Sequence, residues 1–561
     1  MRKELVQWPA ASMLRAKVRD APIEEFVADD LTLRIRAVTL LLAMSSLLSR
    51  ILGYGRDWLI NYEFGATGAT DVYQASFTLP DMINYLLAGG ALSVSLLPRM
   101  SALYAAERNG TAEPGQDGLS HADRVFSIVF TAMLGVAILS VLLGEVLAEP
   151  ILRAWFDGFN DQQIAQTVRL TRIVLPAQLF FIAGGLIQAS LLARQSFRAM
   201  AVTPLLYNLG IIAGGLIGAQ TGNIAGFSWG ALVGALFGGL IAPAWSARHR
   251  LVWRPIWRPT DPEMKAFLWT ALPLMVGVSL TTVDEWLGRK FGSSLQPGSI
   301  SWLNAARKIM LVPIGLLGQA AGQATGTYIA RLHADGAREE MAQVLGKSLA
   351  AVLGLSIVLS VFLVVLPVPV VSILFEYGKF RDRDTLAAAS ALVPLSVGIA
   401  AWGAQAMLAR AFYATGDTWR PMIASTVVTL AMLPVYSAST RWGIAGLGAS
   451  ATIGMTAQAL TLLILARRRL ALDLTTLLDG LARALVVAAT AALAVALTDR
   501  QILALPWSLA ASPRARHWLE ALGCGAVWLA VLIVVGALVD MPGLPRRLQP
   551  IVSRLRRRKA S

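Results

Sequence analysis

Two stretches of this sequence resemble each other: residues 57–65 read DWLINYEFG, and residues 284–292 read DEWLGRKFG. Each begins with an aspartate eight positions before a glycine, and each contains a Trp-Leu pair. A second match follows in the same order, QASLLAR at residues 188–194 and QAMLAR at residues 405–410. The two matches are offset by 227 and 217 residues, and this nearly constant offset indicates an internal duplication.

The composition predicts that the duplicated unit lies in a membrane. Of the 561 residues, 56% are hydrophobic and only 15% are charged, against about 25% charged in average soluble domains. Long apolar runs alternate with short polar breaks, which excludes a cytosolic enzyme, a disordered chain and a fibrous protein. Only helices and closed barrels satisfy their backbone in lipid, and the alternating segments of a barrel are absent. We therefore expect a polytopic α-helical membrane protein.

We predict an all-α integral membrane fold of about fourteen transmembrane helices. A helix needs about 20 residues to cross the hydrocarbon core. The runs that meet this length lie near residues 37–62, 71–102, 125–147, 169–195, 201–220, 225–246, 265–288, 299–330, 345–370, 385–412, 421–440, 443–466, 479–498 and 517–540.

The duplication groups these runs into two pseudo-symmetric six-helix bundles with parallel topology. Such halves pack face to face around a midplane site whose access alternates. The expected divisions are a cytoplasmic N-terminal extension (1–36), an N-terminal half (37–247), a C-terminal half (265–466), a terminal helix pair (479–540) and a basic cytoplasmic tail (541–561).

The basic residues predict the orientation. The formal net charge is +15, and Lys and Arg gather in residues 1–36, 248–258, 467–469 and 546–559. With an even number of spans these segments fall on one side, which the positive-inside rule assigns to the cytoplasm together with both termini. The first segment lacks the apolar core of a signal peptide. So apolar a chain is not expected to bind nucleic acid.

Charged residues inside the spans are costly and mark candidate functional positions. In the first half, Arg50 and Asp57 share one helix face, Arg56 lies beside them, and Asp71 and Asp81 belong to the second span.

In the second half, Asp284 and Glu285 lie in the seventh span, and Asn304, Arg307 and Lys308 share a face of the eighth. Because guanidinium forks match phosphate oxygens, the whole set predicts a cavity lined with Arg and Lys that suits an anionic headgroup.

Other interpretations stay open. One alternative is that these charged residues form internal ion pairs whose sole role is to lower the cost of burial. The pairs would be Arg56 with Asp57 or Asp71, and Arg307 with Asp284. Asp417, in a Gly-Asp-Thr sequence, is typical of a turn. No Walker loop or HExxH motif occurs, and Cys524 is the only cysteine, so we expect no enzyme activity, no metal site and no cofactor.

Three motifs resemble one transporter family. Residues 49–81 (SRILGYGRDWLINYEFGATGATDVYQASFTLPD), 298–318 (GSISWLNAARKIMLVPIGLLG) and 408–421 (LARAFYATGDTWRP) are similar to motifs of the MurJ/MviN lipid II flippases. These flippases belong to the multidrug/oligosaccharidyl-lipid/polysaccharide exporter superfamily. The resemblance covers roughly residues 37–540.

The resemblance implies a bacterial inner-membrane flippase for cell-wall (peptidoglycan) biosynthesis. Such a protein moves the undecaprenyl-diphosphate-linked precursor lipid II to the outer leaflet through a cationic central cavity. Arg50 and Arg56 would hold diphosphate oxygens, and Asp71 would be a gating or pairing carboxylate. The polyprenyl tail would lie along the pair 479–540. Partners would be this glycolipid, membrane lipids and cell-wall synthesis proteins.

The chain departs from the family pattern at three positions. Asn84 and Tyr85 stand where the family usually has an Arg pair, Gly89 replaces a Glu, and Lys308 replaces an Arg beside Arg307. These departures leave another polyprenyl-diphosphate-linked glycan, of the exopolysaccharide or O-antigen type, as the alternative substrate.

A drug exporter or a membrane glycosyltransferase is less favoured. The former needs an acidic cavity and the latter a large outer loop. For energy coupling, the resemblance suggests membrane potential or sodium, with Asp284 as the candidate ion ligand and Asp417 as a weaker one.

Overall fold

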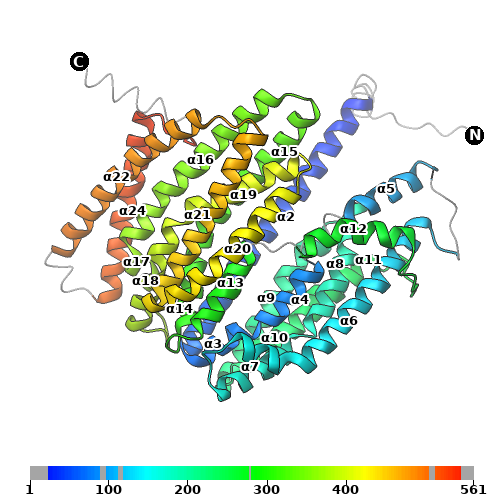
Figure 1. Cartoon of the computed structure of the whole chain (residues 1–561), viewed down its shortest axis with the longest axis horizontal. Coiled ribbons are helices and arrows are strands. Elements are labelled where there is room, and N and C mark those ends of the chain that lie inside the picture. The colour runs from blue at the N-terminus through cyan, green and yellow to red at the C-terminus, as the bar shows by residue number, and fades with distance from the viewer. Residues whose placement is uncertain (1–22, 89–95, 112–117, 277–279, 505–511, 545–561) are drawn as a thin grey trace, which may run out of the picture.

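A computed structural model describes residues 23–88, 96–111, 118–276, 280–504 and 512–544, and the regular elements within these ranges are all helices. Gly89 and most of the expected segments 1–36 and 541–561 lie outside them. The expectation of an all-helical membrane protein is confirmed. Figure 1 shows the helices in two groups, which meet at the end of the molecule that contains α3 (Gly68–Ser76).

The first group follows the expected N-terminal half. Its elements are α2 (Ile23–Phe64), α3 (Gly68–Ser76), α4 (Thr78–Ala88), α5 (Leu97–Arg108), α6 (His121–Trp155), α7 (Asp161–Val174), α8 (Ala177–Ala193), α9 (Arg198–Gln220), α10 (Ala225–Gly234), the π-helical segment η2 (Ala235–Ile241) and α11 (Ala242–Ala247).

The rest of the described chain comprises the expected C-terminal half and the terminal pair. Its elements are α12 (Pro262–Val276), α13 (Leu280–Gly292), α14 (Ser299–Pro313), the π-helical segment η3 (Ile314–Gln319), α15 (Ala320–Ala334), α16 (Arg338–Val365), α17 (Pro367–Phe375), α18 (Asp382–Val397), α19 (Ile399–Ala414), α20 (Trp419–Ser439), the short 3₁₀ turn η4 (Thr440–Trp442), α21 (Gly443–Arg469), α22 (Leu474–Ala504) and α24 (Pro513–Leu538). The first of these helices, α12, lies beside the first group in Figure 1, and the others form the second group.

Nine helices of the described ranges are long and apolar enough to cross a membrane, or ten if the bent pair α18 and α19 forms one span. Several of the expected spans contain more than one helical element. The second runs through α3, α4 and α5, the seventh through α12 and α13, and the eighth through α14, η3 and α15. Glycine, proline and charged residues shorten the apolar stretches there. The count of fourteen stays a prediction.

The seventh span changes its packing partners partway along. Its first part, α12, packs against α4 and α6 of the first half. Its second part, α13, packs against α14, α20 and α21 of the second half. The packing partners therefore change between α12 and α13, and the boundary near residue 265 stays a prediction.

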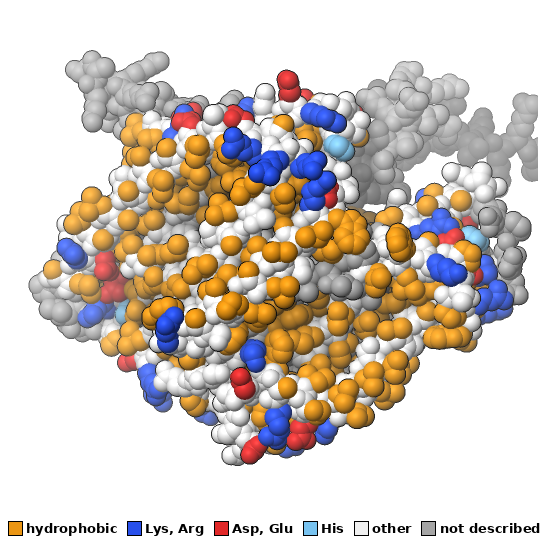
Figure 2. All heavy atoms as spheres, viewed as in Figure 1, with side chains coloured by type: hydrophobic (Ala, Val, Ile, Leu, Met, Phe, Trp, Pro, Cys, Tyr) orange, Lys and Arg blue, Asp and Glu red, His pale blue; other side chains and the backbone are white. Residues whose placement is uncertain are grey.

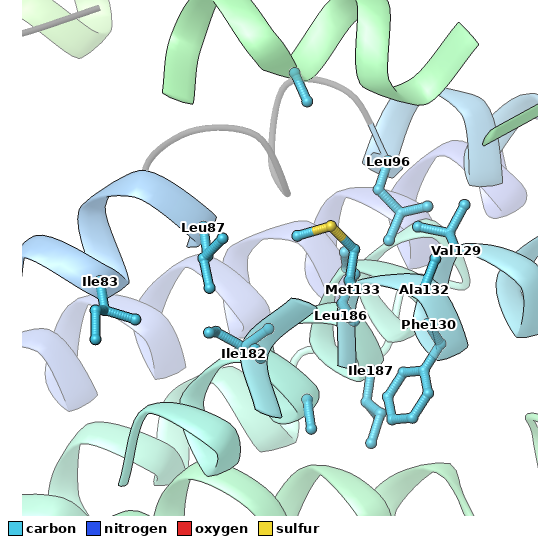
Figure 3. Close-up of a cluster of buried hydrophobic side chains, with 14 of the residues drawn as sticks. Ile83, Leu87, Leu96, Val129, Phe130, Ala132, Met133, Ile182, Leu186 and Ile187 are labelled. Atoms are coloured by element: carbon cyan, nitrogen blue, oxygen red, sulfur yellow. The ribbon is translucent and has the colours of Figure 1, made fainter. Parts of the chain in front are cut away.

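Apolar side chains fill the inside of each half and also cover its outside. Figure 3 shows the first-half core, where Leu87 of α4 lies near Met133 of α6, and Ile182 and Leu186 come from α8. In Figure 2, apolar side chains spread over much of the visible face, and most charged ones lie toward its edges. Val146 of α6 is 73% exposed. Such an apolar exterior is typical of contact with lipid.

The terminal pair lies on the second half alone. The helices α22 and α24 pack against each other, α22 packs on α16, and α24 packs on α17. Figure 1 places both on the far side from the first half.

Close packing of α9 on α10 depends on glycine. A Cβ added at Gly230 would lie 2.4 Å from the carbonyl oxygen of Gly210, and one at Gly226 would lie 2.4 Å from that of Gly214. Small residues that let two helix backbones approach are a common device of membrane helix pairs.

We predict that Gly230→Ala destabilises the protein by about 1–3 kcal/mol, because the two helices must separate to admit the methyl group. The measurement is thermal unfolding in detergent. The control is Gly55→Ala in α2, where an added Cβ meets nothing within 4 Å and better helix propensity raises stability slightly. Equal melting temperatures for the two variants would contradict the prediction.

Candidate functional site

The two halves are joined at one end of the molecule, which we call the closed end (residues 62–71, 298–301 and 377–380). Asp71 of α3, in the first half, is 2% exposed. Its carboxylate accepts hydrogen bonds from the backbone N–H of Gly298 at 2.6 Å and of Ser301 at 2.9 Å, and from the Ser301 hydroxyl at 2.8 Å. The carboxylate thus satisfies the free N–H groups at the start of α14 and complements its positive helix end.

A second contact at the closed end joins backbone to backbone. The N–H of Lys379, in the second half, donates to the carbonyl of Tyr62 at 2.9 Å. The neighbouring Gly378 has a φ of +60°, and a Cβ there would lie 2.3 Å from the same carbonyl oxygen. Glycine is therefore required for this close approach. From this end the two groups diverge, and α5 and α15 lie well apart at the opposite end (Figure 1).

A cavity of about 550 Å³ lies between the halves. The elements α2, α3, α4, α8 and α9 line it from the first half, and α13 and α14 line it from the second. The lining side chains are Arg56, Asp57, Tyr73, Gln74, Phe77, Asp81, Asn84, Tyr85, Gln178, Phe181, Tyr207, Thr282, Glu285, Trp286, Arg289, Asn304 and Lys308.

One charged group in this cavity is centred on Asp57. Its carboxylate lies 2.8 Å from Arg56 Nη2 and 3.1 Å from Lys308 Nζ, which comes from the other half. The Asp57 side chain is only 4% exposed, whereas those of Arg56 and Lys308 are 20% and 35% exposed. The two cations therefore present their charge to the cavity, with their shared counter-ion behind them.

A second charged group is centred on Arg289 of α13. Its Nη1 lies 2.9 Å from the carboxylate of Asp81 on α4, and its Nη2 pairs with Glu285 one turn earlier on its own helix. Here the exposures are reversed: the Arg289 side chain is 9% exposed, and Asp81 and Glu285 are 41% and 47% exposed.

The cavity lining thus contains three basic and three acidic side chains. This differs from the expectation of a lining dominated by Arg and Lys. The physical reason is that a buried cation is costly unless a carboxylate compensates it.

Three predicted site residues, Arg56, Asn84 and Lys308, line the cavity together. The Asn84 side-chain amide donates to Gln178 Oε1 at 2.8 Å, within the first half. Arg50 is not part of the lining: its guanidinium lies against η3, where a Cβ on Gly315 would come within 2.2 Å of Arg50 Nη1. Asp71 is also outside the lining and belongs to the closed end.

The other predicted residues lie outside this cavity. Arg307 points into the second half, where its Nη2 is 2.7 Å from the carboxylate of Asp284. The Tyr436 hydroxyl donates to the same carboxylate. Asp417 accepts from the backbone N–H of Arg420 at the start of α20 and pairs with its guanidinium. Among the described residues no cluster of three His, Cys, Asp or Glu side chains could hold a metal.

Arg289 was not among the candidates from the sequence. The sequence singles out Asp81 and Glu285 as charged residues in spans, but it does not show that both pair with Arg289. The signal available was the spacing of Glu285 and Arg289, since an acid four residues before an arginine is a typical helical ion pair.

Comparison with known proteins places the chain among lipid transporters. A sequence model of the family described as "Lipid II flippase MurJ" matches residues 60–514. The lipid II flippase of Burkholderia cenocepacia is 28% identical over 433 residues, which is 76% of this chain and 82% of that one. The probable lipid II flippase of Buchnera aphidicola is 26% identical over 392 residues, 69% of this chain and 75% of that one.

Solved structures show the same fold. A lipid II flippase in an inward closed conformation aligns with a TM-score of 0.70 at 19% identity, over 88% of this chain and 98% of that one. An inward-facing multidrug resistance transporter, described as a member of the MATE family and the MOP superfamily, aligns with a TM-score of 0.61 at 17% identity, over 75% of this chain and 94% of that one.

The contacts of Asp71 predict that Asp71→Asn loosens the closed end, because it replaces charged hydrogen bonds by weaker neutral ones. A cysteine at Ser299, which is 2% exposed, reports this in a Cys524→Ala background. We expect a maleimide to label it about five- to tenfold faster in the variant. The control is Asp161→Asn, which changes an exposed carboxylate paired within the first half. An unchanged labelling rate in Asp71→Asn would contradict the role of Asp71 in holding the closed end.

Proposed function

Because this chain belongs to the lipid II flippase MurJ family, we propose that it moves lipid II from the inner to the outer leaflet of a bacterial inner membrane. The observation that carries the proposal is the cavity between the halves, in which Arg56 and Lys308 present their positive charge. The diphosphate of lipid II is an anion that guanidinium and ammonium groups bind well. The chain then acts as a transporter and not as an enzyme.

Alternating access gives the headgroup a path from one side of the membrane to the other. We place the closed end on the outer side of the membrane and both termini in the cytoplasm. In this arrangement the headgroup enters from the side where the helices diverge, and its phosphate oxygens take the places of Asp57 on Arg56 and Lys308. Release of Asp71 from the start of α14 then lets the closed end open, while the cavity closes toward the cytoplasm.

Arg56 and Lys308 come from different halves, so a diphosphate that binds both must hold the halves in one relative position. Asn84 lines the same cavity beside Gln178 and offers a neutral amide to the sugar part of the headgroup. Arg50, at η3, is placed to act on the position of α2 against the second half rather than by direct contact with phosphate.

The first test is replacement in living cells. A bacterium depleted of its resident lipid II flippase is expected to grow, and to keep lipid II in its outer leaflet, when it expresses this chain. A chain that is well expressed and membrane-inserted but gives no rescue would contradict lipid II as substrate and favour another polyprenyl-diphosphate-linked glycan.

Arg56→Ala and Lys308→Ala are expected to abolish that rescue, because each removes one of the two cations and leaves Asp57 undercompensated. Arg331→Ala, at a side chain that is 80% exposed and lies outside the cavity, is the control and should rescue fully. Membrane levels of all three variants are compared by immunoblot. Full rescue by both cavity variants would exclude binding through this pair.

For energy coupling, we propose that transport does not depend on sodium. Asp284 and Asp417 were the candidate ion ligands, and each already pairs with an arginine. A sodium ion at Asp284 would have to displace Arg307 and leave that guanidinium buried without its counter-ion.

We therefore expect lipid II translocation in proteoliposomes to change less than about twofold when potassium replaces sodium. A tenfold difference is worth about 1.4 kcal/mol, which a coordinated ion would easily supply. A sodium requirement that disappears in Asp284→Asn would instead establish Asp284 as an ion ligand.

A further inference from the structure

The Arg289 ion pairs form a bond between the two halves inside the cavity. Arg289 is on α13, which packs within the second half, and Asp81 is on α4 of the first half. Arg289 Nη1 also lies 3.4 Å from the hydroxyl of Thr78, on the same α4 helix. Any relative movement of the halves at this depth must therefore break or replace the contact between Arg289 and Asp81.

The exposures indicate which partner can leave. The Asp81 side chain is 41% exposed to the cavity, so it keeps much of its hydration when it moves away. The Arg289 side chain is 9% exposed and is held by Glu285 from one turn earlier, so it stays where it is. A buried guanidinium that loses one carboxylate needs another anion in its place.

We propose that Arg289 is a further substrate-binding residue, which binds the diphosphate of the substrate in exchange for Asp81. Arg56, Lys308 and Arg289 border one cavity, and in this proposal a diphosphate that binds the first two also contacts the third. Binding of the headgroup then breaks an ion pair that ties α13 to α4. Headgroup recognition is thereby coupled to release of the two halves, and Asp81 is the internal competitor of the substrate.

This inference rests on the proposed function, since it needs a diphosphate in the cavity. The experiment measures the affinity of the full-length protein in nanodiscs for undecaprenyl diphosphate as the probe. The variants are Arg289→Gln, Arg289→Lys and Asp81→Asn. The control is Lys290→Gln, whose side chain also bonds the first half, at the carbonyl of Trp155, but does not line the cavity.

We expect Arg289→Gln to weaken binding about tenfold or more, because a charge-assisted phosphate contact is lost. Arg289→Lys should fall between it and the wild type, since the ammonium group cannot form the bidentate contact. Asp81→Asn should bind the probe at least as tightly as the wild type, because the competitor is gone. Lys290→Gln should bind like the wild type.

A purely structural role of the ion pair predicts that Arg289→Gln and Asp81→Asn weaken binding equally, and that result would overturn the inference. If Arg289→Gln does not fold, Asp81→Asn and Arg289→Lys still distinguish a substrate-binding role of Arg289 from a purely structural one. Failure of the proposed function looks different: the wild type would not bind the probe, or Arg56→Gln would bind it unchanged. Loss of binding in Arg56→Gln with unchanged binding in Arg289→Gln would refute only the role of Arg289.

Discussion

Charge buried between apolar helices must be compensated, and this constraint shapes the whole centre of the molecule. Four cations at the cavity or behind it have a carboxylate within reach: Asp57 pairs with Arg56 and Lys308, Asp81 and Glu285 pair with Arg289, and Asp284 pairs with Arg307. Because these carboxylates come from both halves, charge compensation also sets how the halves lie against each other. A site for an anion in such a place is necessarily a site of exchange, in which the ligand takes over from internal partners.

The two ends of the interface are held by different forces. At the closed end, a carboxylate binds the start of a helix and two backbones meet at glycine. In the cavity the halves are joined by ion pairs between long side chains. The first kind of contact is short-ranged and depends on shape, whereas the second can be replaced by a soluble or lipid-linked anion. A transporter needs this difference, because its cargo must replace the ion pairs of the cavity before the contacts at the closed end break.

Sequence patterns predicted the membrane fold, the family and part of the site, because apolar runs and internal matches are properties of single segments. The helical class and the placement of Arg56, Asn84 and Lys308 at one cavity need no knowledge of side-chain partners. The role of Arg289 does need that knowledge, because it depends on the ion pair with Asp81, which lies far away in the chain. The same is true of Asp284, whose nearness to Arg307 was weighed as an alternative but whose Tyr436 contact was not visible. Apolar runs also could not show where packing partners change along a span, because α12 and α13 differ in the helices that they pack against.

The two helices of the expected seventh span pack on different halves of the protein. Because α12 packs on the first half and α13 on the second, the angle between these two helices changes when one half rotates relative to the other. A compound wedged against this span on its lipid side could therefore freeze the protein in one state without competing for the cavity. Such an inhibitor binds outside the cavity, so the cargo affects its binding only through the state that the cargo itself favours.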